Sequence, residues 1–189
     1  NLITLWQALE YITAQNLERR ALAALGAITV VPGAVGAWRR EALELLGGFP
    51  ADTLAEDQDL TIAVQKAGYR ALFDADAIAW TEAPDTARGL ARQRFRWAYG
   101  TLQCLWKHRN ATFNPRCGAL GTIALPQVWL FQILFSVVSP LVDLVLVWQI
   151  VGTSLDYLQH RGQFDDTNLI RMLVFYAAFM AIDLAACAL

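Results

Sequence analysis

Two groups of polar side chains in this 189-residue chain have the types and spacing that group-transfer chemistry needs. The first is Glu-Asp-Gln-Asp at residues 56–59, at the start of a predicted helix. A carboxylate in the first turn of a helix is kept ionised by the helix dipole. If it faces a cleft, it can take the proton from an attacking hydroxyl. The alternative is that these acids only complement the dipole and bind free amides, and the residues alone leave both open.

The second group is the stripe Gln93, Arg96, Trp97 and Gly100, spaced i, i+3, i+4 and i+7 along a helix predicted to start near Thr86. An amide and a guanidinium can hold a diphosphate, and an indole can stack on a sugar ring. Residues 88–116 also contain seven Lys or Arg and no Asp or Glu. The same segment is therefore suited to lie on an anionic bilayer, with its tryptophans at headgroup depth.

Both groups resemble motifs of one known family. Residues 93–97, Gln-Arg-Phe-Arg-Trp, resemble the Q-x-x-R-W signature of processive family 2 glycosyltransferases, the membrane synthases of cellulose, chitin, hyaluronan and poly-N-acetylglucosamine. Residues 56–57 resemble the E-D acceptor-site motif of these enzymes. Residues 32–34, Pro-Gly-Ala, with Arg-Arg at 39–40 and Gly-Gly-Phe at 47–49, resemble their acceptor-binding segment. The motifs occur in the family's order, and an apolar stretch follows them.

The resemblance implies an α/β fold: the C-terminal half of a GT-A type catalytic domain, then an interfacial helix and two transmembrane helices. It implies transfer of a sugar from a UDP-sugar, with inversion, to the non-reducing end of a growing polysaccharide. By this resemblance Asp57 is the catalytic base and Glu56 its partner, Gln93 and Arg96 hold the donor diphosphate or the acceptor, Trp97 stacks on the acceptor sugar, and Gly33 and Ala34 lie beneath it.

The resemblance also places the Mg²⁺ or Mn²⁺ of the full-length enzyme on acidic residues upstream of these motifs, so we assign no metal ligand in this chain. Asp74-Ala75-Asp76 has the form D-x-D but follows the E-D motif, and we interpret it as a turn. Two other functions remain open. One is a non-processive transferase that adds a single sugar to a lipid. The other is a non-catalytic membrane binding or transport module in which the motifs are chance.

The elements that must position these residues follow from periodicity and from turn residues. Residues 2–25 have apolar side chains at helical spacing and end at Gly26, and we expect this helix to pack on a sheet with residues 18–20 facing outward. Glycines at 47–48 and 68 end two further predicted helices. The predicted strands are residues 27–31, 70–74 and 77–81, and the predicted helices are residues 38–46, 55–67 and 86–108.

Composition indicates a membrane protein. Hydrophobic residues make up 56% of the chain and charged residues 17%, and Asp143 is the only charge between residues 117 and 155. We predict a catalytic part at 1–84, an interfacial segment at 85–121 and spans at 122–152 and 169–189. The basic segment before the first span places residues 1–116 in the cytoplasm, on the plasma (inner) membrane. Asp143 and Asp183 fall inside the spans, where they either line a polymer path or are paired locally.

The remaining composition excludes other classes. A net charge of −2 gives no indication of nucleic-acid binding, and three scattered cysteines with two histidines lack the spacing of a zinc site. The predicted partners are therefore a UDP-sugar, a polysaccharide acceptor and the lipid bilayer. The chain starts without methionine and ends within an apolar run, so we expect it to be part of a longer membrane protein that is inactive as this piece alone.

Overall fold

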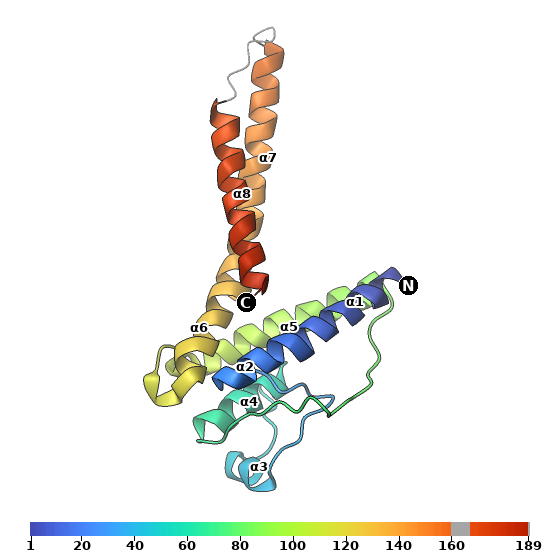
Figure 1. The fold of residues 1–189 in the computed structure, drawn as a ribbon, viewed down its shortest axis with the longest axis vertical. Helices are drawn as coiled ribbons and strands as arrows, with labels where there is room; N and C mark the ends of the chain where they lie inside the picture. The colour runs from blue at the N-terminus through green and yellow to red at the C-terminus, as the bar shows by residue number, and fades with distance from the viewer. Residues whose placement is uncertain (160–166, 189) are drawn as a thin grey trace. The chain divides into compact units, whose positions relative to one another are not determined.

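A computed structural model describes residues 1–159 and 167–188, and the chain divides into two compact units, Asn1–Trp129 and Leu130–Leu189 (Figure 1). The first unit contains α1 (Leu2–Ile12), the π-helix η1 (Thr13–Glu18), α2 (Arg19–Leu25), α3 (Arg40–Leu46), α4 (Glu56–Lys66), α5 (Ala87–Lys107), the 3₁₀-helices η2 (Arg109–Ala111) and η3 (Pro115–Cys117), the π-helix η4 (Leu120–Ala124) and α6 (Leu125–Gln127). The π-helix η5 (Val128–Phe135) leads into the second unit, which contains α7 (Ser136–Gln159) and α8 (Thr167–Ala188).

Three of the predicted helix ends are confirmed. Gly26 and Gly47 follow α2 and α3 with φ of 65° and 77°, a left-handed conformation that glycine adopts without a side-chain clash. Thr86 caps α5, because its side-chain oxygen accepts a hydrogen bond from the amide of Gly89. Sequence therefore located the helix boundaries through their caps.

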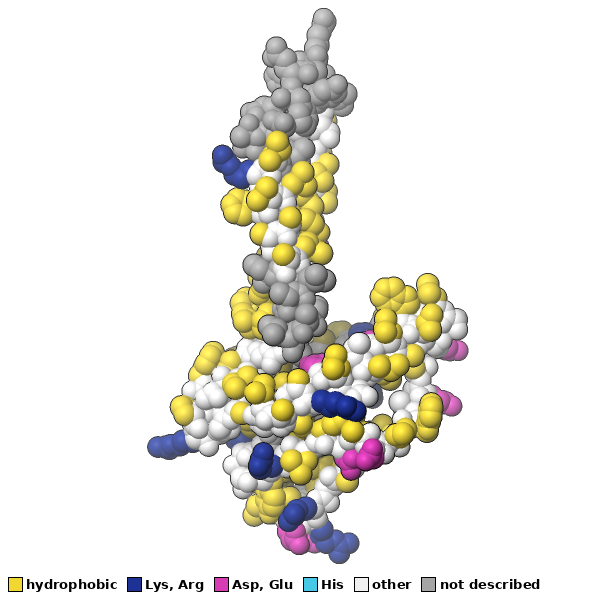
Figure 2. All heavy atoms as spheres, viewed as in Figure 1, with side chains coloured by type: hydrophobic (Ala, Val, Ile, Leu, Met, Phe, Trp, Pro, Cys, Tyr) yellow, Lys and Arg dark blue, Asp and Glu magenta, His cyan; other side chains and the backbone are white. Residues whose placement is uncertain are grey.

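The face that α1 presents differs from the prediction. Its apolar residues are exposed rather than packed on a sheet: Leu2, Leu5, Trp6, Leu9 and Ile12 are 61–69% exposed. Figure 2 shows hydrophobic side chains gathered at this surface. The buried residue of α1 is instead the polar Gln7, which is 2% exposed and donates a hydrogen bond to the Pro84 carbonyl.

The expected strands are not observed. None of residues 1–159 and 167–188 forms a β-strand, so the α/β class is not confirmed. A strand is defined by hydrogen bonds to a neighbouring strand, and residues 27–31 bond to α4 instead. The Val31 amide donates to the Thr61 hydroxyl, and the Ile28 carbonyl accepts from the side chain of Gln65. Residues 70–74 and 77–81 form no regular secondary structure, and between them the Asp76 amide donates to Asp74 in the predicted turn.

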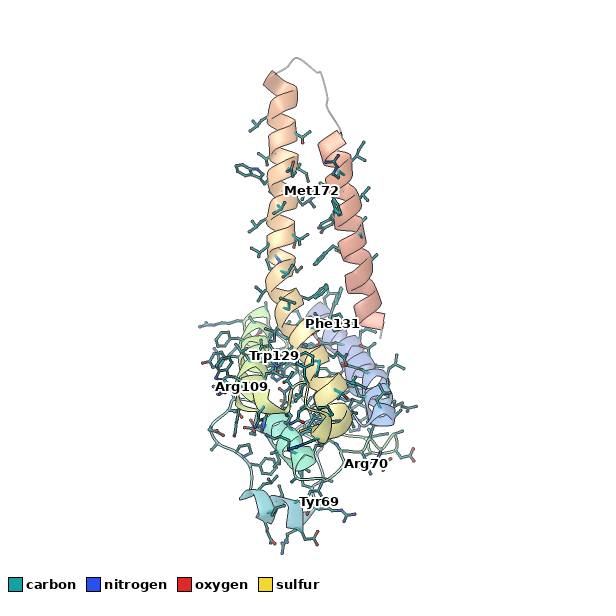
Figure 3. All side chains as sticks on the ribbon, turned by 90° about the vertical axis from the view of Figure 1, so that its left-hand side faces the viewer. Tyr69, Arg70, Arg109, Trp129, Phe131 and Met172 are labelled. Atoms are coloured by element: carbon teal, nitrogen blue, oxygen red, sulfur yellow. The ribbon has the colours of Figure 1, made fainter. Side chains whose placement is uncertain are left out.

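The core of the first unit lies around α4. Leu60 and Ile62 are at most 1% exposed. A cluster of Ala42, Leu60 and Val64 joins α3 to α4, and Tyr69 packs against it (Figure 3). Because α4 is the most completely buried helix, the residues at its start have a fixed support.

The second unit is an apolar helical pair. Among the described residues, the helical stretch Leu120–Leu155 is long and apolar enough to cross a membrane, and Ile170–Ala181 is apolar but shorter. Phe135 of η5 stacks on Phe179 of α8, and Tyr176 donates a hydrogen bond to Asp143. Asp143 is thus paired locally. The Asp183 side chain lies outside the described residues, and the second span and the topology stay predictions.

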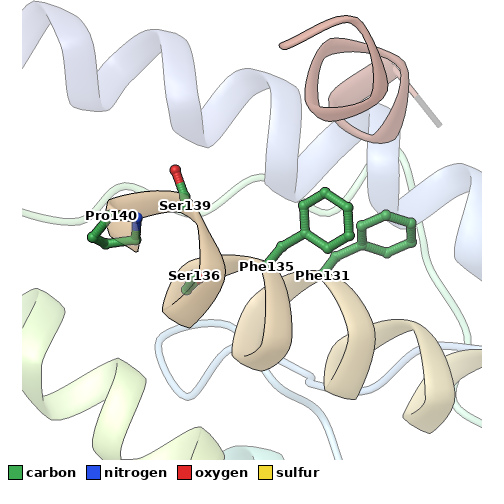
Figure 4. Close-up of a pocket in the computed structure, with 5 residues that line it drawn as sticks. All are labelled: Phe131, Phe135, Ser136, Ser139 and Pro140. Carbon is green, nitrogen blue, oxygen red and sulfur yellow. The ribbon is translucent and has the colours of Figure 1, made fainter. Parts of the chain in front are cut away.

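An open hollow of about 350 Å³ occurs in this unit, lined by Phe131, Phe135, Ser136, Ser139 and Pro140 (Figure 4). All five residues belong to η5 and the start of α7. The lining carries no ionisable group and none of the residues predicted to do chemistry, so the candidate site lies in the first unit.

Candidate functional site

The Asp57 carboxylate contacts the Gly33 loop directly. One oxygen of Asp57 accepts a hydrogen bond from the Gly33 amide at 3.0 Å, and the other accepts from the Gln58 amide at 2.8 Å. Two predicted site segments, far apart in the sequence, are therefore brought together. A side chain at Gly33 would start 3.5 Å from the carboxylate oxygen. The glycine thus leaves space immediately beside this group.

Thr61 of α4 links Asp57 to the segment that leads into the Gly33 loop. The Thr61 hydroxyl donates to the Asp57 carbonyl at 2.7 Å and accepts from the Val31 amide at 2.9 Å. Asp57 is half-buried, whereas Glu56 beside it is exposed, as is Ala34 in the loop. Of the two predicted catalytic carboxylates, the structure fixes Asp57 in place and leaves Glu56 at the surface.

Helix α5 packs against the start of α4 through Gly100. A Cβ atom added at Gly100 would lie 2.8 Å from the Ala55 Cβ and 2.9 Å from the Ala55 amide nitrogen. Such distances are far inside van der Waals contact, so only glycine fits this crossing. Two hydrogen bonds flank the contact: Thr101 donates to Gln58, and the Leu54 amide donates to Gln103. Sequence placed Gly100 on the motif face, and the structure shows it as the contact point between the two motifs.

The remaining motif residues lie along α5 beside α1. Trp97 is half-buried against Tyr11 of α1, with ring centroids 6.4 Å apart, and Arg96 is exposed. The carboxamide oxygen of Gln93 is buried and has no hydrogen-bond partner among the described residues. An unpaired buried acceptor is unusual in a folded protein. A hydroxyl or other donor of a ligand would satisfy it.

Asp59 anchors a polar cluster that the sequence analysis did not predict. Its carboxylate is 1% exposed. One carboxylate oxygen accepts hydrogen bonds from Lys107 at 2.8 Å and from Thr53 at 3.0 Å, and the other lies 2.7 Å from His108 Nε2. The cluster gives Asp59 a structural role, because it ties α4 to the end of α5. The sequence signal was the Lys-His pair at residues 107–108.

Charge in this cluster is balanced by hydrogen bonding. Burial lowers the pKa of Lys107, but its hydrogen bonds to Asp52 and Asp59 outweigh that effect and raise the pKa overall. The hydrogen bond from Lys107 lowers the pKa of Asp52. Burial lowers the pKa of His108 below its ordinary 6.5; the hydrogen bond to Asp59 opposes this shift and the charge of Lys66 adds to it.

Hydrogen bonding also fixes the tautomer of His108. Lys66 Nζ lies 3.2 Å from His108 Nδ1, and an ammonium group only donates, so Nδ1 is the acceptor. Nε2 then carries the proton and donates to Asp59. His108 is therefore neutral in the folded protein, between a lysine and an aspartate.

We expect this cluster to make the folded protein less stable as pH falls below about 6.5, the ordinary value for histidine. The pKa of His108 is lowered in the folded state, so the unfolded chain takes up the proton at a higher pH than the folded chain does. The free energy of unfolding therefore decreases as the pH falls, and it levels off once the pH is below both pKa values. The measurement is the midpoint of thermal unfolding across pH for the wild type and for His108→Gln, which keeps a donor and an acceptor but does not titrate. The wild type should lose stability more steeply; parallel curves would contradict the assignment.

Arg19 was expected to face outward, but in the structure it is largely buried. Its Nε atom is buried without a hydrogen-bond partner among the described residues. Burial lowers the pKa of Arg19, while the carboxylates of Glu18 and Asp57 oppose this, so Asp57 is within its electrostatic range. The physical reason is the π-helix η1, which has more residues per turn than an α-helix and shifts the phase of the residues after it.

The site residues do not form a metal centre. Among the described residues, no three His, Cys, Asp or Glu side chains are grouped so that they could hold a metal ion. The described residues thus offer no such group of ligands for Mg²⁺ or Mn²⁺, and we derive no step through a metal. Cys104 is buried beside Ala55, and burial raises the pKa of its thiol to about 12, so it does not act as a thiolate nucleophile.

Comparison with known proteins finds relatives that match part of this chain. The chain is 45% identical over 80 residues to "Probable glycosyltransferase YdaM" of Bacillus subtilis, which covers 42% of this chain and 19% of that protein. It is 38% identical over 104 residues to an N-acetylglucosaminyltransferase of Rhizobium meliloti, which covers 50% and 24%. It is 25% identical over 132 residues to a poly-beta-1,6-N-acetyl-D-glucosamine synthase of Staphylococcus aureus, which covers 68% and 32%.

The chain thus spans about a fifth to a third of the length of these curated relatives. No solved structure matches it. The model of the family described as glycosyl transferase family group 2 matches residues 1–185, nearly the whole chain. The Asp57–Gly33 contact and the Gln93–Trp97 motif both lie within the matched residues. The chain belongs to glycosyl transferase family group 2.

Proposed function

We propose that the whole protein transfers a sugar from a UDP-sugar to a growing polysaccharide at the membrane, with inversion at the anomeric carbon. The observation that carries the proposal is the Asp57 carboxylate, which is fixed against the Gly33 amide at 3.0 Å. We assign the role of base to this carboxylate because backbone amides hold it beside an exposed glycine loop. The polymer product is supported by the synthase among the relatives.

In this proposal Asp57 removes the proton from a hydroxyl of the acceptor sugar as that oxygen attacks the anomeric carbon. The new glycosidic bond forms as the bond to the diphosphate breaks, and UDP leaves with the electron pair. Attack opposite the leaving group inverts the anomeric centre. Glu56, exposed beside Asp57, is assigned a secondary role.

The leaving diphosphate needs a cation, and Arg96 is the candidate. Arg94 is already paired with Glu10, whereas Arg96 is exposed and forms no ion pair among the described residues. A guanidinium matches phosphate oxygens with two parallel hydrogen bonds. Gln93 supplies its unpaired carboxamide oxygen to a sugar hydroxyl, and Trp97 stacks on the acceptor ring.

The donor we propose is UDP-N-acetylglucosamine, because two of the relatives are named for N-acetylglucosamine transfer or polymer synthesis. The GT-A type of fold is proposed on the same basis, from the family rather than from strands. Membrane location is supported by the apolar stretch Leu120–Leu155. The upstream acids that the family uses for Mg²⁺ or Mn²⁺ would belong to the whole enzyme.

The test is incorporation of radiolabelled sugar by membranes that carry the full-length protein, with a panel of UDP-sugars and separation of products by length. Long polymer from UDP-N-acetylglucosamine is the expected result. A single added sugar on a lipid would show a non-processive transferase instead. Incorporation from none of the donors, with the protein present in the membrane, would contradict the proposed activity.

A further inference from the structure

Trp97 of α5 is held against α1 by three other side chains. The guanidinium carbon of Arg94 lies 4.7 Å from the centroid of the Trp97 ring, within the range of a cation–π contact. Both terminal nitrogens of Arg94 pair with the two carboxylate oxygens of Glu10 on α1. Tyr11, the next residue on α1, packs its ring against Trp97 with an interplanar angle of 32°. We call Glu10, Tyr11, Arg94 and Trp97 the indole clamp.

The indole clamp has a defined chain of contacts. Helices α1 and α5 lie side by side (Figure 1), and Glu10 reaches across to the guanidinium that covers the indole ring. A bidentate carboxylate fixes the plane and position of a guanidinium better than a single contact does. Without Glu10, Arg94 would be one of several unpaired arginines on a basic helix, free to turn toward solvent or toward an anionic ligand.

We propose that Glu10 is a positioning residue for acceptor binding: through Arg94 it fixes the orientation of the Trp97 indole on which the acceptor sugar stacks. This rests on the proposed function, which assigns Trp97 to the acceptor. Stacking on a sugar needs one ring face open and a fixed ring plane. Arg94 lies over the ring, and Trp97 is only partly buried, so part of the indole remains accessible to a sugar. Glu10 also neutralises Arg94, so Arg94 does not compete with Arg96 for the diphosphate.

The pair contributes little to folding, so a variant can be interpreted. The side chains of Arg94 and Glu10 are 37% and 43% exposed, and ion pairs as exposed as this one stabilise proteins only slightly. Removing the charge of Glu10 should therefore change acceptor binding more than stability. A role that was merely structural would change the amount of folded protein and leave the Michaelis constant for the acceptor unaltered.

The experiment uses the full-length protein in membranes, with UDP-N-acetylglucosamine as donor and an N-acetylglucosamine tetramer as acceptor, each varied in turn. For Glu10→Gln we expect the acceptor KM to rise about three- to fivefold, the size of an exposed cation–π contact, while the donor KM stays unchanged. Glu44→Gln, on an exposed acid of α3 that forms no ion pair among the described residues, is the matched control.

A charge swap separates positioning from stability. The double variant Glu10→Arg with Arg94→Glu restores an ion pair between α1 and α5 but puts a carboxylate, not a guanidinium, beside the indole. It should therefore keep the raised acceptor KM. A wild-type acceptor KM in Glu10→Gln, with the wild type active, would overturn this inference alone. A wild type that transfers no sugar would overturn the proposed function, and the inference with it.

Discussion

Replacing Asp57 by asparagine is expected to lower sugar transfer about 10²- to 10⁴-fold, the usual contribution of a general base. The amide keeps the size of the side chain, and its single oxygen can still accept the hydrogen bond from the Gly33 amide, although the bond from the Gln58 amide is then lost. The loop should therefore stay in place. What is lost is the group that takes the proton from the acceptor hydroxyl. The measurement is incorporation of labelled sugar by membranes with equal amounts of each protein.

The matched control is Asp76→Asn, because Asp76 is an exposed turn residue whose hydrogen bond to Asp74 is made by its backbone amide and not by its carboxylate. This variant should transfer sugar as the wild type does. Glu56→Gln should fall between the two, because Glu56 is exposed and adjacent to the base. If Asp57→Asn were as active as the wild type, Asp57 would no longer be the base and the site would have to be rebuilt around Glu56.

The second large effect is expected at Gly100, where a single methyl group should disturb the crossing of α4 and α5. Gly100→Ala places a Cβ 2.8 Å from the Ala55 Cβ and 2.9 Å from the Ala55 amide nitrogen. Overpacking of this kind destabilises proteins by about 1–3 kcal/mol. Because Ala55 directly precedes the helix that carries Asp57, we also expect loss of transfer activity. Thermal unfolding and sugar incorporation measure the two consequences.

Two further variants test the physical reason. Gly100→Ala combined with Ala55→Gly removes the facing methyl group but not the backbone nitrogen, so it should restore stability only in part. Gly152→Ala, on α7, meets no atom within 4 Å and should leave stability unchanged or slightly higher. If Gly100→Ala matched Gly152→Ala in stability, the close contact between α4 and α5 would be wrong.

Features that depend on a few neighbouring residues could be predicted from the sequence. A glycine after a helix, a threonine before one and acids in a first turn act within a few residues, so the ends of α2, α3 and α5 were predicted correctly. Family motifs are also local, and residues 93–97 indicated the family that the comparison confirms. The predicted Asp74–Asp76 turn belongs to the same class.

Predictions that depended on neighbours were less successful. The apolar spacing of α1 predicted a helix correctly but not its surroundings, because periodicity shows which side chains share a face and not what covers that face. The strand expected at residues 27–31 is likewise β-branched, yet its backbone bonds to Thr61 and Gln65. Strand formation requires a partner strand, which a single segment cannot specify.

Several helix caps, the apolar stretch and the family could be predicted from the sequence alone, because each of these depends on residue types at short spacing. Which residues meet became known from the tertiary structure: Gly33 with Asp57, Gly100 with Ala55, and Asp59 with His108. These pairs lie between 24 and 49 residues apart in the chain. Their contact depends on how helices cross, and crossing is set by packing and by the phase change at η1, which no short pattern contains.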